Sequence, residues 1–318
     1  MKYPSMLHYP RFKLWIVVLA GACFCRTTIA TTVWIDTDPS IGSPLREVDD
    51  AYALVLAFHS PEIWIAGIST SYGNADLKRT TAVARELVDR FGARSGLSSG
   101  NVHVGASSAQ DGETAATTAF ASTLRRRSRI TYVALGPLTN LATFVRLHPN
   151  LVERIERVIF VGGTSPGVRI GFGRTGFQIS DANVVKDPEA VRTVLRSKIP
   201  VLLAPAEVSS HFYLNTADLQ LLREGGPAGR YLSRHSGVWL WFWTHHLQTR
   251  GGPLFDTLAI LPGANRTSVR IETRYAIFEQ GLVAQRSSTP GSRKVEFIAG
   301  FAPQAKRMVV DRLRRDRK

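Results

Sequence analysis

The sequence predicts an α/β fold with an open, mostly parallel sheet. Short apolar runs of strand length alternate along the chain with segments of helical periodicity. These runs are largely apolar throughout, as is typical of strands that helices cover on both faces. Acidic and amide side chains follow several runs directly, and in open parallel sheets the ligand crevice lies at the carboxyl ends of the strands. The sequence therefore predicts a ligand site at that edge of the sheet.

The predicted elements follow these patterns in order. Strands are expected at 32–35, 63–69, 130–135, 157–161 and 200–204, and helices at 50–59, 75–91, 138–148 and 188–197. Beyond residue 204 we expect a helical stretch around 229–248 and antiparallel strands within 269–285 and 294–300. Met308, Val309 and Leu313 have near-helical spacing in the tail. The tail is predicted to be a docked helix with a solvated basic face, and an arm for an anionic surface is the alternative.

The formal net charge of +15 by itself suggests an acidic partner such as nucleic acid. The two ends carry much of this charge, because residues 1–30 contribute +4 and residues 306–318 contribute +5. The remaining +6 is ordinary for a body of this size, and the sequence has no zinc-finger spacing or aromatic-rich RNA-binding motif. We therefore expect no nucleic-acid partner.

Residues 1–30 are predicted to form a signal peptide. A basic stretch precedes the apolar run LWIVVLAGACFC, which is too short for a comfortable membrane span. Cleavage after Ala30 would leave a secreted or periplasmic protein that begins at Thr31, and an uncleaved membrane anchor is the alternative. In both cases the membrane is met only through this segment. Both cysteines, Cys23 and Cys25, lie in it, so cleavage would remove every thiol.

The segment VWIDTDPSIGSPLREVDDA, residues 33–51, concentrates acid within this basic chain. Mutual repulsion makes such a cluster costly unless a cation or a reacting proton compensates it. A further acid lies in FDTLAI, residues 255–260, before an apolar helical run. Hard cations such as Ca²⁺ prefer carboxylate oxygens, and no His/Cys cluster of the zinc type accompanies these acids. The residues alone leave two interpretations open, a carboxylate metal site and a solvated acidic loop.

Five motifs, in order, resemble those of the inosine–uridine-preferring nucleoside hydrolase family. They are D-T-D-P-x-I with a later D-D-A, STSYGN, YVALGPLTNLA, FVGG with SDANVVKDPEA, and FDTLAI. The resemblance extends from Val33 to the C-terminal region. It implies an open, Rossmann-like fold of the nucleoside hydrolase type over residues 31–318. It also implies hydrolysis of the N-ribosidic bond of nucleosides with a bound Ca²⁺.

The resemblance implies a metal site made of three carboxylates and one backbone carbonyl. Asp38 would bind calcium and take a proton from the attacking water. Asp50 and Asp256 would be the second and third carboxylate ligands. Leu135 would offer its backbone carbonyl oxygen, so the identity of its side chain should matter little.

The resemblance also implies which residues hold the sugar. Asp49 and Asn183 would bind ribose hydroxyl groups, and Asn74 would lie beside the metal-bound water and the sugar. Asp181 stands where the family usually has Glu, against the 5′ side of the ribose. Asp36 would support the ligand shell.

The sequence departs from the family pattern around the leaving group. Ser40 replaces a Gly, and Gly42–Val48 is an insertion that either bulges outward or displaces the ligands. Phe255 replaces the usual His, and Thr175 falls where a ribose-binding Asn is expected. These differences affect handling of the leaving group more than the metal core.

Two groups of side chains could compensate for these departures. His245 and His246 could replace the missing acid, but neighbouring residues of a helix point in different directions, so a core or surface role is favoured. Trp239, Trp241 and Trp243 could stack on a base, although their spacing on a helix favours packing.

Two other functions remain alternatives to a nucleoside hydrolase. A haloacid-dehalogenase-type phosphatase also opens its site with strand-D-x-D, but it has no role for the D-D pair or for G-P-L-T-N. A non-catalytic ribose- or nucleoside-binding protein would result if the lengthened loop abolished turnover. In the leading prediction the partner is a small nucleoside, and the sequence leaves room for a homo-oligomer.

Overall fold

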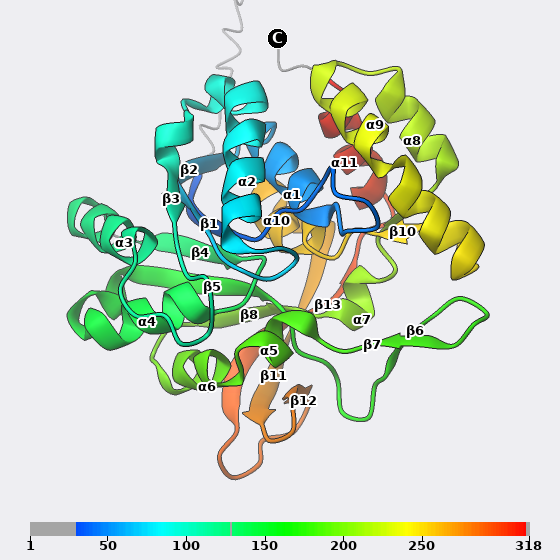
Figure 1. Ribbon diagram of the computed structural model, residues 1–318. Helices are drawn as coiled ribbons and strands as arrows, with labels where there is room; N and C mark the ends of the chain where they lie inside the picture. Colours follow the sequence, from blue (N-terminus) through cyan, green and yellow to red (C-terminus); the bar gives the residue numbers. More distant parts are fainter. Residues whose placement is uncertain (1–29, 128, 316–318) are drawn as a thin grey trace, which may run out of the picture.

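A computed structural model describes residues 30–127 and 129–315, and within these ranges the chain is organised around a nine-stranded sheet (Figure 1). The strand order is β12-β11-β13-β8-β5-β4-β1-β2-β3. Six of these strands belong to the amino-terminal two thirds and run parallel: β1 (Thr31–Thr37), β2 (Ile63–Thr70), β3 (Val102–Val104), β4 (Ile130–Ala134), β5 (Ile155–Val161) and β8 (Val201–Ala204). The predicted open, mostly parallel sheet is therefore confirmed.

The last three strands extend the sheet beyond β8. They are β11 (Val269–Phe278), β12 (Leu282–Gln285) and β13 (Arg293–Phe301). β13 pairs parallel with β8, whereas β11 pairs antiparallel with both β12 and β13. This end of the sheet confirms the antiparallel run that the sequence predicts.

Helices cover both faces of the sheet, as the apolar strands require. In β1, Val33 and Ile35 pack into one core while Trp34 packs into the other, which is the two-residue period of a strand. The first core contains residues of α1 (Asp49–Phe58), α2 (Leu77–Phe91), α8 (Thr216–Arg223), α9 (Pro227–Trp241), α10 (Thr257–Ala264) and α11 (Ala305–Arg314). The second contains residues of α3 (Ala115–Arg126), α4 (Thr139–Leu147) and α6 (Pro188–Arg196), and Figure 1 shows the two groups on opposite sides of the sheet.

Some elements differ from the sequence prediction. The prediction omits β3, α3, the short helices α5 (Ala182–Lys186) and α7 (Ala206–Ser209), and two small sheets, β6 (Ile170–Phe172) with β7 (Phe177–Ile179) and β9 (Tyr213–Leu214) with β10 (Gly252–Pro253). The helix expected around 229–248 is α9 followed by a π-helical turn, Phe242–His246. The docked tail helix is confirmed, because α11 buries Val309 and Leu313.

The predicted signal peptide lies almost wholly outside the described residues. The described part of the chain contains no helix that is both long and apolar enough to cross a membrane.

Candidate active site and metal centre

The acids singled out in the sequence gather at the carboxyl ends of the parallel strands. β1 ends at Thr37, and Asp38 follows it directly. α1 begins with Asp49 and Asp50, and Asp256 lies immediately before α10. A cavity of about 260 Å³ opens beside them, lined by Glu47, Asp49, Asn74, Leu135, Val161, Gly162, Phe177, Ile179, Ser180, Asp181, Ala182, Asn183, Ala206, Phe242, Trp243, Phe255 and Asp256. The lining therefore combines acidic and amide side chains with aromatic and aliphatic ones.

Three carboxylates form a compact buried group. Asp49, Asp50 and Asp256 each offer one oxygen, and these oxygens all lie within 4.8 Å of one another. Three hydrogen bonds fix Asp50: the Thr37 hydroxyl and the Asp38 N–H donate to its Oδ1 at 2.5 and 3.1 Å, and the Asn74 amide donates to its Oδ2 at 2.9 Å. Residues at and after the ends of β1 and β2 therefore fix the position of the Asp50 carboxylate.

Asp38 lies next to this group and has one oxygen without a protein partner. Its Oδ2 accepts the backbone N–H of Asn74 at 2.7 Å, while its buried Oδ1 accepts no hydrogen bond from the residues that the structure describes. The Oδ1 of Asp49 is buried and unpartnered in the same way. Buried carboxylate oxygens are normally hydrogen-bonded or bound to a metal, because leaving them unpaired is costly. The two orphaned oxygens beside an all-carboxylate group therefore fit a hard cation.

The same residues carry strongly perturbed pKa values. Burial raises the pKa of Asp38, Asp49 and Asp256 well above the usual range, and repulsion from neighbouring carboxylates adds to it. Burial also raises the pKa of Asp50, although hydrogen bonds from Thr37 and others oppose the shift. Without a counter-charge, the folded chain therefore disfavours the fully ionised cluster.

Asp36 is a buried acid of β1 that is held by hydrogen bonds from two neighbouring elements. Its Oδ1 accepts hydrogen bonds from the Ser69 hydroxyl at 2.6 Å and from the Asn140 side-chain amide at 2.9 Å. Burial raises its pKa to about 6, and these donors limit the shift. Through these bonds Asp36 links β1 to β2 and α4, two residues before Asp38.

The residues predicted to hold ribose line the same cavity. Asn183 donates its side-chain amide to the carbonyls of Leu135 at 2.6 Å and Val161 at 3.0 Å. Asp181 accepts the N–H groups of Gly163 at 2.5 Å and Val184 at 3.4 Å, and so caps α5. The structure therefore brings the expected metal and sugar residues together, while their individual roles stay predictions. The compact group contains Asp49, which was assigned to the sugar, rather than Asp38.

The inserted loop is exposed at its centre, and the acids that follow it are buried. Leu45 is exposed at 58%, while Asp49 and Asp50 are buried at the start of α1. The Ser40 hydroxyl donates to the Glu47 carbonyl at 2.9 Å, and the Arg46 guanidinium donates to the Asn74 carbonyl at 3.1 Å. The centre of the loop therefore points outward, while Glu47 at its end turns to the cavity.

The sequence placed Glu47 among the clustered acids but assigned it no role, and it favoured packing for Trp243, which lines the cavity. Glu47 Oε2 accepts the indole N–H of Trp239 at 2.9 Å. Burial raises the pKa of Glu47 to about 7, and the Trp239 hydrogen bond opposes this shift. Trp243 packs edge-on against Phe172 and Phe255, with ring centroids 4.8 and 6.5 Å apart. The position of the insertion next to the D-D pair was the available signal for Glu47.

The paired histidines do not line this cavity. His245 stacks on Trp241 and His246 on Phe242, with ring centroids 6.0 and 5.2 Å apart, and both histidines are exposed. This geometry agrees with the core or surface role favoured from the sequence, and it is the surface that they occupy.

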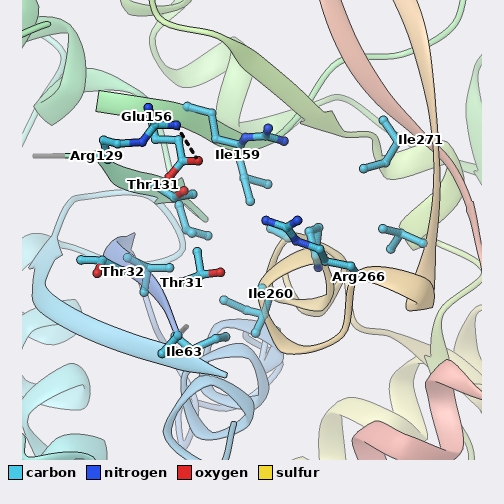
Figure 2. Close-up of a pocket in the computed structure, with 18 residues that line it drawn as sticks. Thr31, Thr32, Ile63, Arg129, Thr131, Glu156, Ile159, Ile260, Arg266 and Ile271 are labelled. Carbon is cyan, nitrogen blue, oxygen red and sulfur yellow. Dashed lines mark hydrogen bonds and ion pairs between the residues drawn. The ribbon is translucent and has the colours of Figure 1, made fainter. Parts of the chain in front are cut away.

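A second, larger cavity of about 570 Å³ lies at the opposite edge of the sheet (Figure 2). Its lining includes Thr31 and Thr131 near the amino ends of β1 and β4, together with Ile260 of α10. Arg129 and Glu156 form an ion pair at one side of this cavity (Figure 2), and 3.5 Å separates the guanidinium nitrogen from the carboxylate oxygen. None of the clustered aspartates lines this larger cavity. The candidate active site is therefore the smaller cavity, of about 260 Å³.

Known proteins resemble this chain over most of its length. A sequence model described as "Inosine-uridine preferring nucleoside hydrolase" matches residues 33–311. The pyrimidine-specific ribonucleoside hydrolase RihA of Salmonella agona (strain SL483) is 29% identical, over 89% of this chain and 95% of its own length.

Two solved structures share the fold. They are a plant nucleoside hydrolase, PpNRh1, and a purine-preferring ribonucleoside hydrolase from Gardnerella vaginalis. Each has a TM-score of 0.73 and 20% sequence identity, over 89% of this chain and 98% of its own. The family match over most of the sequence shows that the chain belongs to the inosine-uridine preferring nucleoside hydrolase family and is a nucleoside hydrolase.

Proposed function

We propose that the protein uses a bound Ca²⁺ to hydrolyse the N-glycosidic bond of ribonucleosides, releasing ribose and the free base. The observation that carries this proposal is the buried acid cluster, with orphaned oxygens on Asp38 and Asp49, beside a cavity that Asp49 and Asp256 line. Calcium takes six to eight oxygen ligands and tolerates irregular geometry, which suits a carboxylate-only donor set. Asp38, Asp50, Asp256 and the Leu135 carbonyl would hold the ion.

The bound ion would supply a polarised water and a fixed positive charge beside the sugar. Asp38 is the proposed general base, because it is buried at the cluster and one of its oxygens is free of hydrogen bonds. Asn74 orients this carboxylate by donating its backbone N–H at 2.7 Å. The proton that leaves the water therefore goes to Asp38.

The polar lining fixes the ribose while the bond to the base breaks. Cleavage builds oxocarbenium character on the sugar, and contacts to its hydroxyl groups help distort it towards that state. Asp49, Asn74, Asp181 and Asn183 line the cavity where such contacts would form. The aromatic side chains of Phe177, Phe242, Trp243 and Phe255 offer flat apolar surface for the base.

We also propose that residues 1–30 direct export, which gives a secreted or periplasmic enzyme, with retention as a membrane anchor as the alternative. The basic and apolar pattern of this segment supports the proposal. Fractionation of cells that express the full chain, with N-terminal sequencing of the soluble product, tests it. A mature chain that starts at Met1 and stays in the cytosol would contradict export.

The activity is tested with the protein beginning at Thr31 and a panel of ribonucleosides, assayed with and without a calcium chelator. We expect free ribose and free base, and loss of product after chelation that added Ca²⁺ restores. Release of phosphate from phosphate esters would instead support a phosphatase. Binding of nucleosides without any product would support a non-catalytic binder.

A further inference from the structure

The inserted segment Gly42–Val48 brings one side chain, Glu47, into the candidate active site. Family resemblance assigns this residue no role, because it lies within the insertion. Two bonds fix its position: the Ser40 hydroxyl donates to its carbonyl, and the Trp239 indole N–H donates to Oε2, both at 2.9 Å. Its other oxygen, Oε1, accepts no hydrogen bond from the described part of the chain and is not sealed from the cavity. Oε1 of the ionised side chain is therefore a fixed acceptor available to a ligand.

The lining of the cavity indicates which part of a nucleoside Oε1 meets. Its acidic residues, such as Asp49 and Asp256, suit a hydroxyl-rich ribose, and its aromatic residues suit a flat base. Glu47 has a neighbour in each set, because its carboxylate repels that of Asp49 and accepts the indole N–H of Trp239, one helical turn before Phe242. An acceptor between the two sets would meet the edge of a base whose ribose lies against the acids.

We infer that Glu47 is a specificity-determining residue that accepts a hydrogen bond from an exocyclic amino group of the base. This inference rests on the proposed function and names the substrate class. In cytosine and adenine the amino group offers two N–H donors, whereas uracil and hypoxanthine carry a carbonyl oxygen at the same position. That oxygen would face Oε1 with its lone pairs. The ring N–H of uracil or hypoxanthine can also donate, but a carboxylate oxygen that approaches it is repelled by the carbonyl oxygen beside it. Glu47 therefore favours cytidine over uridine and adenosine over inosine.

The test measures kcat/KM for cytidine, uridine, adenosine and inosine with the calcium-loaded protein. We expect each amino-bearing nucleoside to be preferred by about tenfold within its pair, since one well-placed hydrogen bond is worth about that factor. In Glu47→Gln the amide can turn to donate to a carbonyl oxygen, so both ratios should fall towards one. Glu113→Gln, which changes an exposed glutamate outside the cavity, is the matched control and should keep the wild-type ratios.

A second variant covers the case in which Glu47→Gln fails to fold. Trp239→Phe keeps the ring but removes the N–H that fixes Glu47, and it should lower both ratios in the same direction. Ratios that stay at the wild-type value in a folded Glu47→Gln, or in Trp239→Phe when Glu47→Gln is unfolded, overturn the inference while leaving the hydrolase intact. If the wild-type protein cleaves none of the four nucleosides, the proposed function itself fails.

Discussion

A Cβ atom on Gly73 would lie 1.7 Å from Oδ2 of Asp38, so residue 73 leaves room for that carboxylate only as glycine. Gly73→Ala must push Asp38 away and break its 2.7 Å hydrogen bond from the Asn74 N–H. Because displacement of a catalytic group by about 1 Å can cost about 100-fold in rate, we expect kcat to fall by at least about that factor. Steady-state kinetics with a saturating nucleoside measure it.

Gly112→Ala is the matched control, since a Cβ there meets no atom within 4 Å. This control should keep both the rate and the melting temperature of the wild type. A Gly73→Ala protein with a wild-type rate would show that Asp38 need not hold this position.

Asp38→Asn tests the proposed general base without changing its size. The variant loses the charge and the proton acceptor, so we expect kcat to fall by about 10²–10⁴-fold. The rate should fall even at saturating calcium, since added metal cannot replace a base. The rate of Asp38→Asn is measured across a calcium titration. Loss of a ligand alone is overcome by added calcium, whereas loss of the base is not. Near-native turnover would mean that the role transferred from the family is wrong.

The central parallel strands were predictable because they are buried on both faces, as β4 and β8 are at every position. Residues 63–69 are apolar for most of their length, and β2 occupies 63–70. The β6–β7 hairpin could not be predicted, because each of its strands has three residues and Phe177 and Gln178 are exposed. Its position depends on tertiary contacts such as the edge-to-face packing of Phe172 on Trp243. Local sequence carries little of that information.

The composition of the candidate site was more predictable than its internal geometry. The order of the motifs places the acids at strand ends, and the structure gathers them there. The sequence did not show which hydrogen-bond partners distant segments contribute. One such partner is the Leu135 carbonyl, which accepts a hydrogen bond from the Asn183 side-chain amide. Glu47 was not predictable either, because its position depends on Trp239, which lies 192 residues away in the sequence.

Removal of the metal should lower stability as well as activity. Burial and repulsion raise the pKa values of Asp38, Asp49 and Asp256, so the charged cluster opposes folding at neutral pH unless a cation compensates it. We expect chelation to lower the melting temperature, and calcium at about 100 times its dissociation constant to restore about 2.7 kcal/mol. Thermal melts over a calcium series measure this. An identical melting curve in metal-free protein would contradict a cation at this cluster.

Asp181 should make stability depend on pH. Burial raises its pKa from 3.8 to about 6, although N–H groups of Gly163 and Val184 oppose the shift. Because the folded chain binds this proton more tightly, the contribution of Asp181 to stability is full below pH 3.8 and is lost as the pH rises through about 6. Asp181→Asn should therefore be more stable than wild type by about 1 kcal/mol at pH 7.5, with a smaller gain at pH 5.

Denaturant melts at the two pH values measure the difference between Asp181→Asn and the wild type. Asp111→Asn is a control of opposite sign, because hydrogen bonds from Ser108 and Ser107 lower the pKa of that partly exposed carboxylate. It should give no gain at pH 7.5. A gain for Asp181→Asn that grows towards pH 5 would contradict the assigned direction.

Phe255 should limit which leaving groups depart quickly. It lines the cavity and packs edge-on against Phe172 at 6.1 Å, and its side chain cannot donate a proton to a base. We therefore expect a para-nitrophenyl riboside, whose leaving group needs no protonation, to be cleaved faster than inosine. Phe255→His places a proton donor at this position and should raise inosine cleavage by about tenfold or more, because general acid catalysis contributes about 10²–10⁴-fold when the donor is well placed. Rates for both substrates in the wild type and the variant decide the matter. Wild-type inosine hydrolysis as fast as that of the activated riboside would show that another group already supplies the proton.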